Sequence, residues 1–439
     1  MTYVGKWLMT ITASISLTAN AFAQQQERYL EFSLEELSAV DVVKPLLPLD
    51  VDSSAIISGN TVNLGYLLPM AGYPDFTKEL INSAQLAIEE INKQGGVSGK
   101  KLFLVPADIG ATEEFIVKRA NRLIDNYNTH LFLGPTSSDG LINLSDQLLP
   151  KKDFMIVSPT ATSPAVSALQ DRGLIFRTCP SDAVQGKQAA AFCYSDLGSQ
   201  KAAVLYHDNF YGRTLQETFA REFEEAGGMI LNAVRINPHI NIDDYDMGDK
   251  LDSLLMGKPD VIYVISLAKS FSAISHQMAR KKVFSDGYRP VIVMSDGATG
   301  EDLAQMGNLE VLNGMYGFYL PFTGNEKFAA KYEQKYAQKP LSLAAEYTYD
   351  IVYLMALAVM NANSTDPLLV SLHLQMVATK GLPVTSENFS QAREFINSGK
   401  DVNYEGITGK LDFDRNGDVN ERSFSRWQLV DGEIIYIDK

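Results

Sequence analysis

The chain has 439 residues, of which 46% are hydrophobic and 21% charged, the proportions of an ordinary globular protein. Its formal net charge of −15 argues against binding to nucleic acid and against adhesion to an anionic membrane surface. A chain of this length can bury a sizeable core and is expected to form two domains or lobes.

The first 23 residues have the layout of a secretory signal peptide. Lys6 precedes an apolar run from Trp7 to Leu17, and Ala21-Phe22-Ala23 stands before a Gln-rich stretch. No cysteine stands at the cleavage junction, which disfavours a lipid anchor, and no later apolar run is suited to cross a bilayer. We therefore expect a soluble periplasmic protein that does not insert into the membrane after the signal is removed.

Residues 24–60 form a leader that does not look like part of a compact lobe. Ser33 and Glu36 can form a capping box for a short helix, which Pro45 and Pro48 would end. We expect this leader to be mobile or loosely docked, and docking on the body or on a partner is the alternative.

From residue 61 onward, strand and helix patterns alternate. Buried-strand runs at 62–67, 102–105, 131–133 and 154–157 are separated by helical periodicity at 80–91, 113–127 and 140–149. After residues 175–178 the same alternation restarts and runs to residue 294. The pattern predicts an α/β fold of two lobes, each a parallel sheet flanked by helices.

The chain is expected to cross between the lobes three times, near Pro180, near Phe318 to Pro321 and near Tyr404 to Gly406. This assigns residues 61–180 and 320–405 to an N-lobe, and residues 181–319 and 406–439 to a C-lobe. The segment 325–397 is expected to be mostly helical. Hairpin-like strands are expected around 409–413 and 426–430.

Cys179 and Cys193 are the only cysteines. A helix beginning near Asp182 would hold the two sulfur atoms too far apart for a disulfide, so two buried free thiols are favoured over a bridge. The two cysteines and five scattered histidines give no metal-ligand spacing. We expect neither a metal nor a cofactor.

Two hydroxyl-rich clusters follow adjacent predicted strands of the N-lobe. Residues 134–138 read Gly-Pro-Thr-Ser-Ser, and residues 158–164 read Ser-Pro-Thr-Ala-Thr-Ser-Pro. Residues just past the carboxyl ends of parallel strands face one crevice, which makes Ser138 and Thr162 candidates for a binding site. Hydroxyl groups and helix N–H groups there can hold a carboxylate. The alternative is that each cluster is only turn chemistry.

The same strand-end rule applied to the C-lobe gives three pairs of residues, Asp208 and Tyr211, Ser266 and Leu267, and Ser295 and Asp296. The carboxylate of Asp296 could pair with an ammonium group or accept hydrogen bonds from an amide. Its alternative role is that of a turn residue or helix N-cap.

Residues 412–418 match the first half of an EF-hand calcium loop. The twelfth position is Ser423 instead of a bidentate Glu, and the flanks look like strands, so a hairpin turn is the favoured interpretation. No phosphate-binding Gly loop, nucleophile elbow or His-Glu-x-x-His motif occurs, and we expect no enzymatic activity.

From Val62 to the C-terminus the sequence resembles type I periplasmic solute-binding proteins of the leucine/isoleucine/valine-binding family, which serve ABC importers. The resemblance rests on the order and spacing of several segments: Gly65 to Pro69, Ala87 to Lys100, Gly134 to Ser138, Ser158 to Pro164, Phe176 to Thr178, Tyr211-Gly212 and Tyr347 to Asp350. The family fold has two α/β lobes joined by three crossovers and closes on its ligand by hinge motion.

The resemblance also implies roles for individual residues. Ser138 and Thr162 would hold the ligand carboxylate, and Asp296, one carbon shorter than the Glu expected there, would receive an α-ammonium group. Leu267 stands where the family has an aromatic residue, which argues against a standard branched-chain amino acid as ligand. The complete set of expected ligand-binding residues is Ser138, Thr160, Thr162, Tyr211, Asp296, Phe76 and Leu267.

These features predict a periplasmic protein that captures a small amino acid, carboxylate or amide and delivers it to an ABC permease in the inner membrane. The alternative is a sensor or regulatory module of the same fold that signals to a membrane or cell-wall partner.

We predict that the exported protein begins at Gln24, because Ala21-Phe22-Ala23 has the small-residue pattern of a cleavage site. Intact-mass analysis of the protein recovered from the periplasm checks this. The uncleaved mass or a lipid adduct would contradict it.

Overall fold

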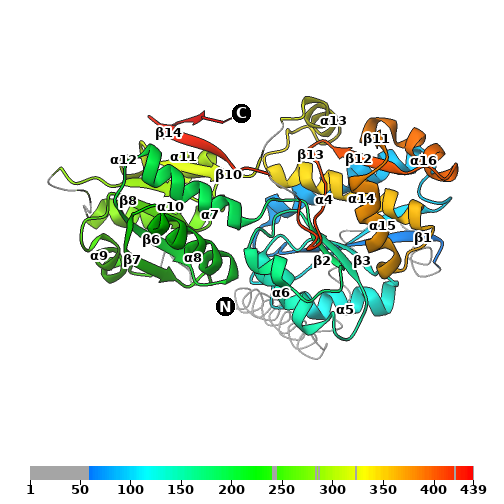
Figure 1. Cartoon of the computed structure of the whole chain (residues 1–439), viewed down its shortest axis with the longest axis horizontal. Helices are drawn as coiled ribbons and strands as arrows, with labels where there is room; N and C mark the ends of the chain where they lie inside the picture. Colours follow the sequence, from blue (N-terminus) through cyan, green and yellow to red (C-terminus); the bar gives the residue numbers. More distant parts are fainter. Residues whose placement is uncertain are drawn as a thin grey trace, which may run out of the picture.

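The computed structural model describes residues 59–239, 245–281, 284, 287–321, 324–419 and 422–438. The predicted signal peptide and nearly all of the predicted leader lie outside these residues. The described chain folds into two lobes (Figure 1), as the sequence predicts.

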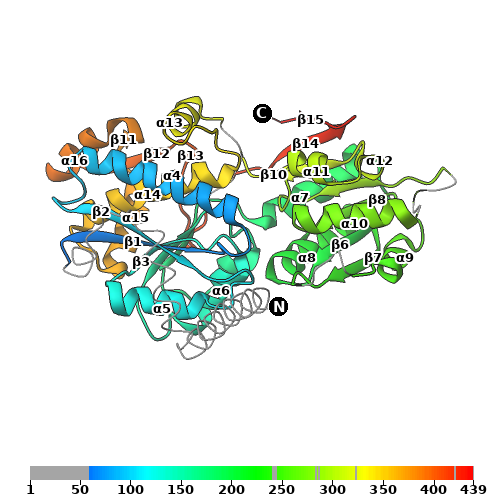
Figure 2. The same cartoon turned by 180° about the vertical axis from the view of Figure 1, so that it is seen from behind.

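The N-lobe is built on a parallel sheet in the order β2-β1-β3-β4-β5. Its strands and first helices are β1 (Thr61–Leu68), α4 (Pro74–Lys93), β2 (Lys101–Asp108), α5 (Ile116–Tyr127), β3 (Leu131–Leu133), α6 (Ser138–Gln147), β4 (Met155–Ser158) and β5 (Ile175–Arg177). The helices α4 and α14 cover one face of this sheet, whereas α5 and α6 cover the other (Figures 1 and 2).

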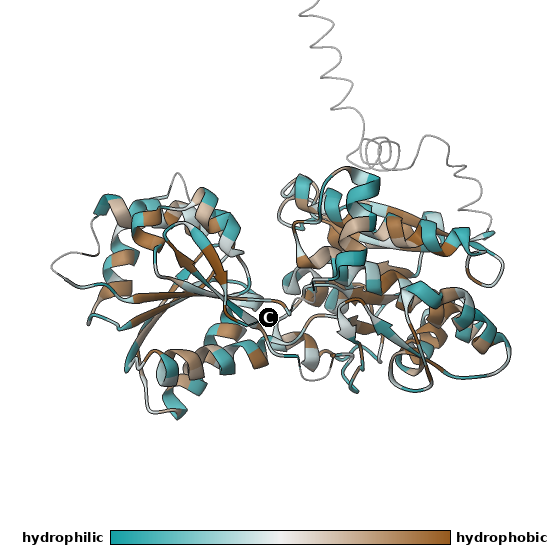
Figure 3. Cartoon of the chain, turned by 90° about the horizontal axis from the view of Figure 1, so that it is seen from above, coloured by the Kyte–Doolittle hydropathy of each residue, from teal (hydrophilic) through white to brown (hydrophobic). Residues whose placement is uncertain are grey.

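The C-lobe sheet has the order β15-β14-β10-β9-β8-β6-β7, with β14 and β15 antiparallel at one edge. Its elements are α7 (Asp182–Ala191), β6 (Lys201–His207), α8 (Phe210–Glu225), β7 (Met229–Ile236), α9 (Gly248–Leu255), β8 (Val261–Ile265), α10 (Ala268–Lys281), β9 (Val291–Met294), α11 (Gly300–Met306), α12 (Leu309–Leu312), β10 (Tyr316–Tyr319), β14 (Ser425–Val430) and β15 (Glu433–Tyr436). In both lobes the apolar strands lie inside and the helices turn polar faces outward (Figure 3).

Between β10 and β14 the chain returns to the N-lobe. This part contains α13 (Glu326–Tyr336), α14 (Leu343–Ala362), α15 (Pro367–Thr379), β11 (Leu382–Val384), α16 (Phe389–Asn397), β12 (Val402–Gly406) and β13 (Gly409–Lys410). Among the described residues, α14 alone is long and apolar enough to cross a membrane. It is almost entirely buried in the N-lobe, as expected of a core helix.

The prediction that the last C-lobe segment begins at residue 406 was wrong. Leu411, Phe413 and Val419 pack into the N-lobe core, because the chain after β13 makes a turn whose residue Asp418 pairs with the end of β5. Phe413 pairs antiparallel with Val419, so the hairpin turn predicted at 412–418 is present. The chain then enters the C-lobe at β14.

Cys179 and Cys193 are both free and fully buried in the C-lobe core. Burial raises the pKa of each thiol because the thiolate would lose its hydration. We predict that a thiol reagent labels neither residue in the native protein and labels both after denaturation without reductant. Labelling of neither residue after denaturation would show that they are bridged.

Candidate functional site

The candidate site begins at the first crossover, where the N-terminus of α7 meets the loop after β4. The Asp182 N–H donates to the Thr162 carbonyl oxygen at 2.8 Å. The hydroxyl of Ser181 caps α7 by accepting from the Ala183 N–H. Asp182 and Gln185, one turn apart on α7, are both fully buried polar residues.

Asp182 and Gln185 connect a residue of the N-lobe to a residue of the C-lobe. Thr162 Oγ1 donates to Asp182 Oδ2 at 2.7 Å. Gln185 Nε2 lies 2.5 Å from Asp182 Oδ1 and 2.9 Å from Asp296 Oδ1, and Gln185 Oε1 accepts from the Asp296 N–H at 3.0 Å. The Tyr211 hydroxyl lies 2.7 Å from Asp296 Oδ1. We call these five residues the interlobe network.

Two carboxyl groups of the interlobe network have perturbed acidity. Burial, reinforced by the neighbouring Asp296, raises the pKa of Asp182 well above its ordinary value. Burial also raises the pKa of Asp296, against the opposing effect of its bonds to Gln185 and Tyr211. A proton retained on Asp182 would let that carboxyl donate to Thr162 Oγ1. The Thr162 hydroxyl would then be free to donate to a ligand.

Ser138 stands at the start of α6, next to the interlobe network. It is 3% exposed, and its Oγ accepts from the Ser163 N–H at 3.1 Å, so its own proton can be given to another acceptor. The preceding Ser137 caps α6 by accepting from the Gly140 N–H at 3.0 Å. The start of α6 therefore offers a hydroxyl donor beside the positive end of a helix dipole.

The starts of α6 and α8 also join the two lobes directly. Asp139 Oδ1 accepts from the Phe210 N–H at 3.0 Å, and the hydroxyl oxygens of Ser163 and Thr214 are 2.9 Å apart. The two helix N-termini approach each other from opposite lobes (Figure 1). The positive ends of two helix dipoles thus converge where the hydroxyl-rich loops lie.

The remaining expected site residues lie outside the interlobe network. Thr160 Oγ1 donates to the Thr136 carbonyl oxygen at 2.8 Å, which ties together the loops after β3 and β4. Leu267 follows β8 and is 37% exposed. Phe76 lies in the first turn of α4 and packs partly against the N-lobe core. The structure therefore brings Thr162, Tyr211 and Asp296 together, with Ser138 adjacent.

Asp182 and Gln185 were not among the sequence candidates. An acidic residue at the first position of a helix is common because it complements the helix dipole, so Asp182 carried no distinct signal. The spacing of three residues puts Gln185 on the same face, but nothing local indicates that this face is buried between two lobes.

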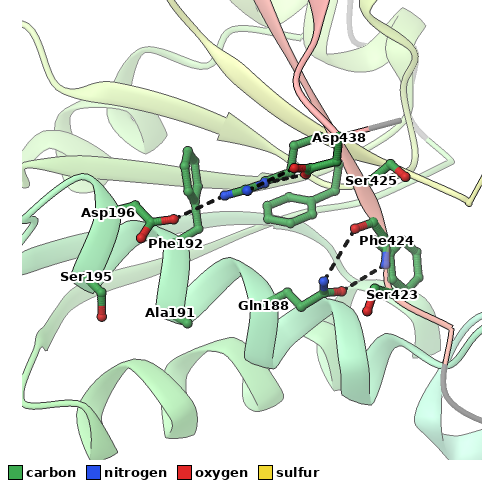
Figure 4. A pocket seen from close by; sticks show the side chains of 11 residues that line it. Gln188, Ala191, Phe192, Ser195, Asp196, Ser423, Phe424, Ser425 and Asp438 are labelled. Carbon is green, nitrogen blue, oxygen red and sulfur yellow. Dashed lines mark hydrogen bonds and ion pairs between the residues drawn. The ribbon is translucent and has the colours of Figure 1, made fainter.

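A cavity of about 390 Å³ lies elsewhere in the C-lobe, between the C-terminal end of α7 and β14 (Figure 4). Arg426 lies over the Phe192 ring, 4.8 Å from its centre, and pairs with Asp196 and Asp438. None of the seven expected ligand-binding residues lines this cavity.

The raised pKa of Asp182 contributes to the pH dependence of stability. Above a carboxyl pKa of about 4, Asp182 keeps its proton to a higher pH in the folded protein than in the unfolded chain, so its contribution to the free energy of unfolding falls as pH rises. Asp182→Asn removes this ionisation. We therefore predict that the melting temperature of Asp182→Asn minus that of wild type is larger at pH 8 than at pH 4.5. A difference in melting temperature that stays the same from pH 4.5 to pH 8 would contradict the prediction.

A family model described as "Periplasmic binding protein" matches residues 61–431. A chemotactic signal transduction substrate-binding protein of Halobacterium salinarum is 27% identical, over 81% of this chain and 84% of that protein. A Leu/Ile/Val-binding protein homolog of Brucella melitensis is 23% identical, over 86% of this chain and 94% of that protein. The crystal structure of a leucine-binding protein from Thermotoga maritima shares the fold. It has a TM-score of 0.69 and 24% identity, covering 86% of this chain and 98% of that one. The chain thus belongs to the type I periplasmic binding proteins of the branched-chain amino acid family.

Proposed function

We propose that this protein captures a small amino acid, carboxylate or amide between its two lobes in the periplasm and delivers it to an ABC permease. The observation that carries the proposal is the interlobe network, in which Thr162 of the N-lobe is joined through α7 to Asp296 and Tyr211 of the C-lobe. Groups from both lobes at one site are what a ligand needs in order to favour the closed state.

The chemistry of the site supports a ligand with an anionic group and a hydrogen-bonding or cationic group. Ser138 and the converging starts of α6 and α8 suit a carboxylate. On the opposite lobe, the carboxyl of Asp296 suits an ammonium or amide group. Thr160, Phe76 and Leu267 complete the proposed site from the surrounding loops and α4. Nothing in this arrangement requires a chemical reaction, and the proposed role is binding alone.

Chemosensory signalling is the second candidate function. It is favoured by the relative from Halobacterium salinarum, whose name assigns it to a chemotactic system and which aligns with most of this chain. In this role the ligand-bound closed form would be recognised by a membrane receptor instead of a permease.

Two experiments test the proposal. A thermal-shift screen with the standard L-amino acids, small carboxylates and amides identifies a ligand, because a compound that binds only the folded state raises the melting temperature. Uptake of that labelled ligand and chemotaxis toward it are then compared in a deletion strain. Loss of uptake supports transport, whereas loss of chemotaxis with normal uptake supports sensing.

We predict that Ser138→Ala and Thr162→Ala each weaken binding about tenfold to a hundredfold, because each loses a hydrogen bond to a charged ligand group. Isothermal titration calorimetry measures this. Ser398→Ala, at an exposed position after α16 in the same lobe, is the matched control and should bind as wild type does. Unchanged affinity in both Ser138→Ala and Thr162→Ala would place the site elsewhere.

We predict that Asp296→Asn separates two ligand classes. The substitution removes a negative charge and keeps a side chain of similar size, so a large loss of affinity indicates an ammonium-bearing ligand. Little change indicates a carboxylate or amide without an ammonium group. Affinity measured for paired compounds with and without an amino group checks this assignment. Equal losses for both members of a pair would contradict a charge contact with Asp296.

A further inference from the structure

The buried side chain of Arg177, at the end of β5, holds the loop that carries Thr162. Its Nη1 donates to the carbonyl oxygens of Ala161 at 3.0 Å and Ser163 at 2.8 Å, the residues on either side of Thr162. Its Nη2 donates to Ser167 Oγ at 2.8 Å. Arg177 is 0% exposed, so water does not compete for these bonds. One guanidinium group thus fixes the backbone on both sides of a proposed ligand-binding residue.

Asp418 in turn holds the guanidinium of Arg177. Arg177 Nε lies 2.6 Å from Asp418 Oδ1, and Arg177 Nη2 lies 3.0 Å from Asp418 Oδ2. The same Oδ2 accepts from Ser167 Oγ at 2.6 Å. A two-point contact of this kind fixes the plane of the guanidinium group as well as its position.

The turn that presents Asp418 is the one that looks like half of an EF-hand loop. The carboxylates of Asp414 and Asp418 are engaged within the protein: Asp418 holds Arg177, and Asp414 Oδ1 accepts from the N–H groups of Asn416 at 2.7 Å and Asp418 at 3.1 Å. Gly417 has φ +75°, and a Cβ there would lie 2.2 Å from the Ile175 carbonyl oxygen, so the turn fits closely against β5. Across the described ranges, no group of three His, Cys, Asp or Glu residues is placed to hold a metal ion.

We infer that Arg177 and Asp418 are positioning residues that hold the Ala161–Ser163 backbone, and with it Thr162, in the geometry that binds ligand. The inference rests on the proposed function, because it takes Thr162 as a ligand contact. The turn that directly precedes the third crossover thus becomes part of the ligand site, although neither Arg177 nor Asp418 touches the ligand. It also gives the acidic turn a role other than calcium binding.

Two variants test the inference. Asp418→Asn removes the charge that holds Arg177 and leaves a buried cation, so it should lower both stability and affinity. Arg177→Lys keeps the positive charge beside Asp418, but its single nitrogen cannot replace the three guanidinium nitrogens, of which Nε and Nη2 hold Asp418 and Nη1 holds both carbonyl oxygens. We expect Arg177→Lys to keep most of the melting temperature of the unliganded protein and to bind about tenfold more weakly.

The control is Asp438→Asn, which breaks a similar two-point pair with Arg426 in the C-lobe, at 2.7 and 3.2 Å. It should lower the melting temperature without changing affinity. Each variant is titrated calorimetrically with the L-amino acid, carboxylate or amide that gives wild type its largest thermal shift. If Asp418→Asn does not fold, Arg177→Lys decides the question.

Three results would overturn the inference. Wild-type affinity in Arg177→Lys and Asp418→Asn would show that the pair serves the fold alone. Equal loss of affinity in Asp438→Asn would show that any loss of stability weakens binding. An increase in the melting temperature with calcium chloride that wild type shows and Asp418→Asn does not would assign the turn to a metal. In contrast, wild-type protein that binds none of these compounds would refute the proposed function, and the inference with it.

Discussion

The burial of charged and polar groups at the first crossover constrains the whole site. Arg177 and Asp182, five positions apart, are both fully buried, and a buried charge is costly unless it is paired or neutralised. Arg177 is paired with Asp418, whereas Asp182 is hydrogen bonded to Thr162 and Gln185 and has a raised pKa. The partners of both groups converge on residues 161–163. Satisfying these groups therefore also sets the shape of the proposed ligand-binding loop.

The same crossover couples the loop to the opposite lobe. Gln185 contacts Asp182 on one side and Asp296 on the other, so a change of protonation at one carboxyl group affects the other. Thr162 can donate outward only when Asp182 does not take its proton. The protonation of Asp182 and Asp296 is thus linked to whether Thr162 can donate to a ligand. It is also linked to the hydrogen bonds that join the two lobes.

Most of the fold and part of the candidate site could be predicted from local sequence patterns. Alternating strand and helix periodicity predicted the two sheets, and the strand-end rule predicted Ser138, Thr162, Tyr211 and Asp296. The third crossover was misplaced because residues 411–419 look like an ordinary hairpin. Their place in the N-lobe depends on Arg177, whose bond to Asp418 spans 241 positions. No local sequence pattern indicates a contact over such a separation. The burial of Asp182 was missed for the same reason.

The most direct measurement of the central claim is a crystal structure of the protein with the ligand found by thermal shift. We predict that the ligand lies between the lobes, with its anionic group at Ser138 and the loop of residues 160–163 and its other polar end at Asp296 and Tyr211. Arg177 should be bound to Asp418 as it is here. A ligand held by one lobe alone, or seated in the C-lobe cavity beside Arg426, would contradict the account.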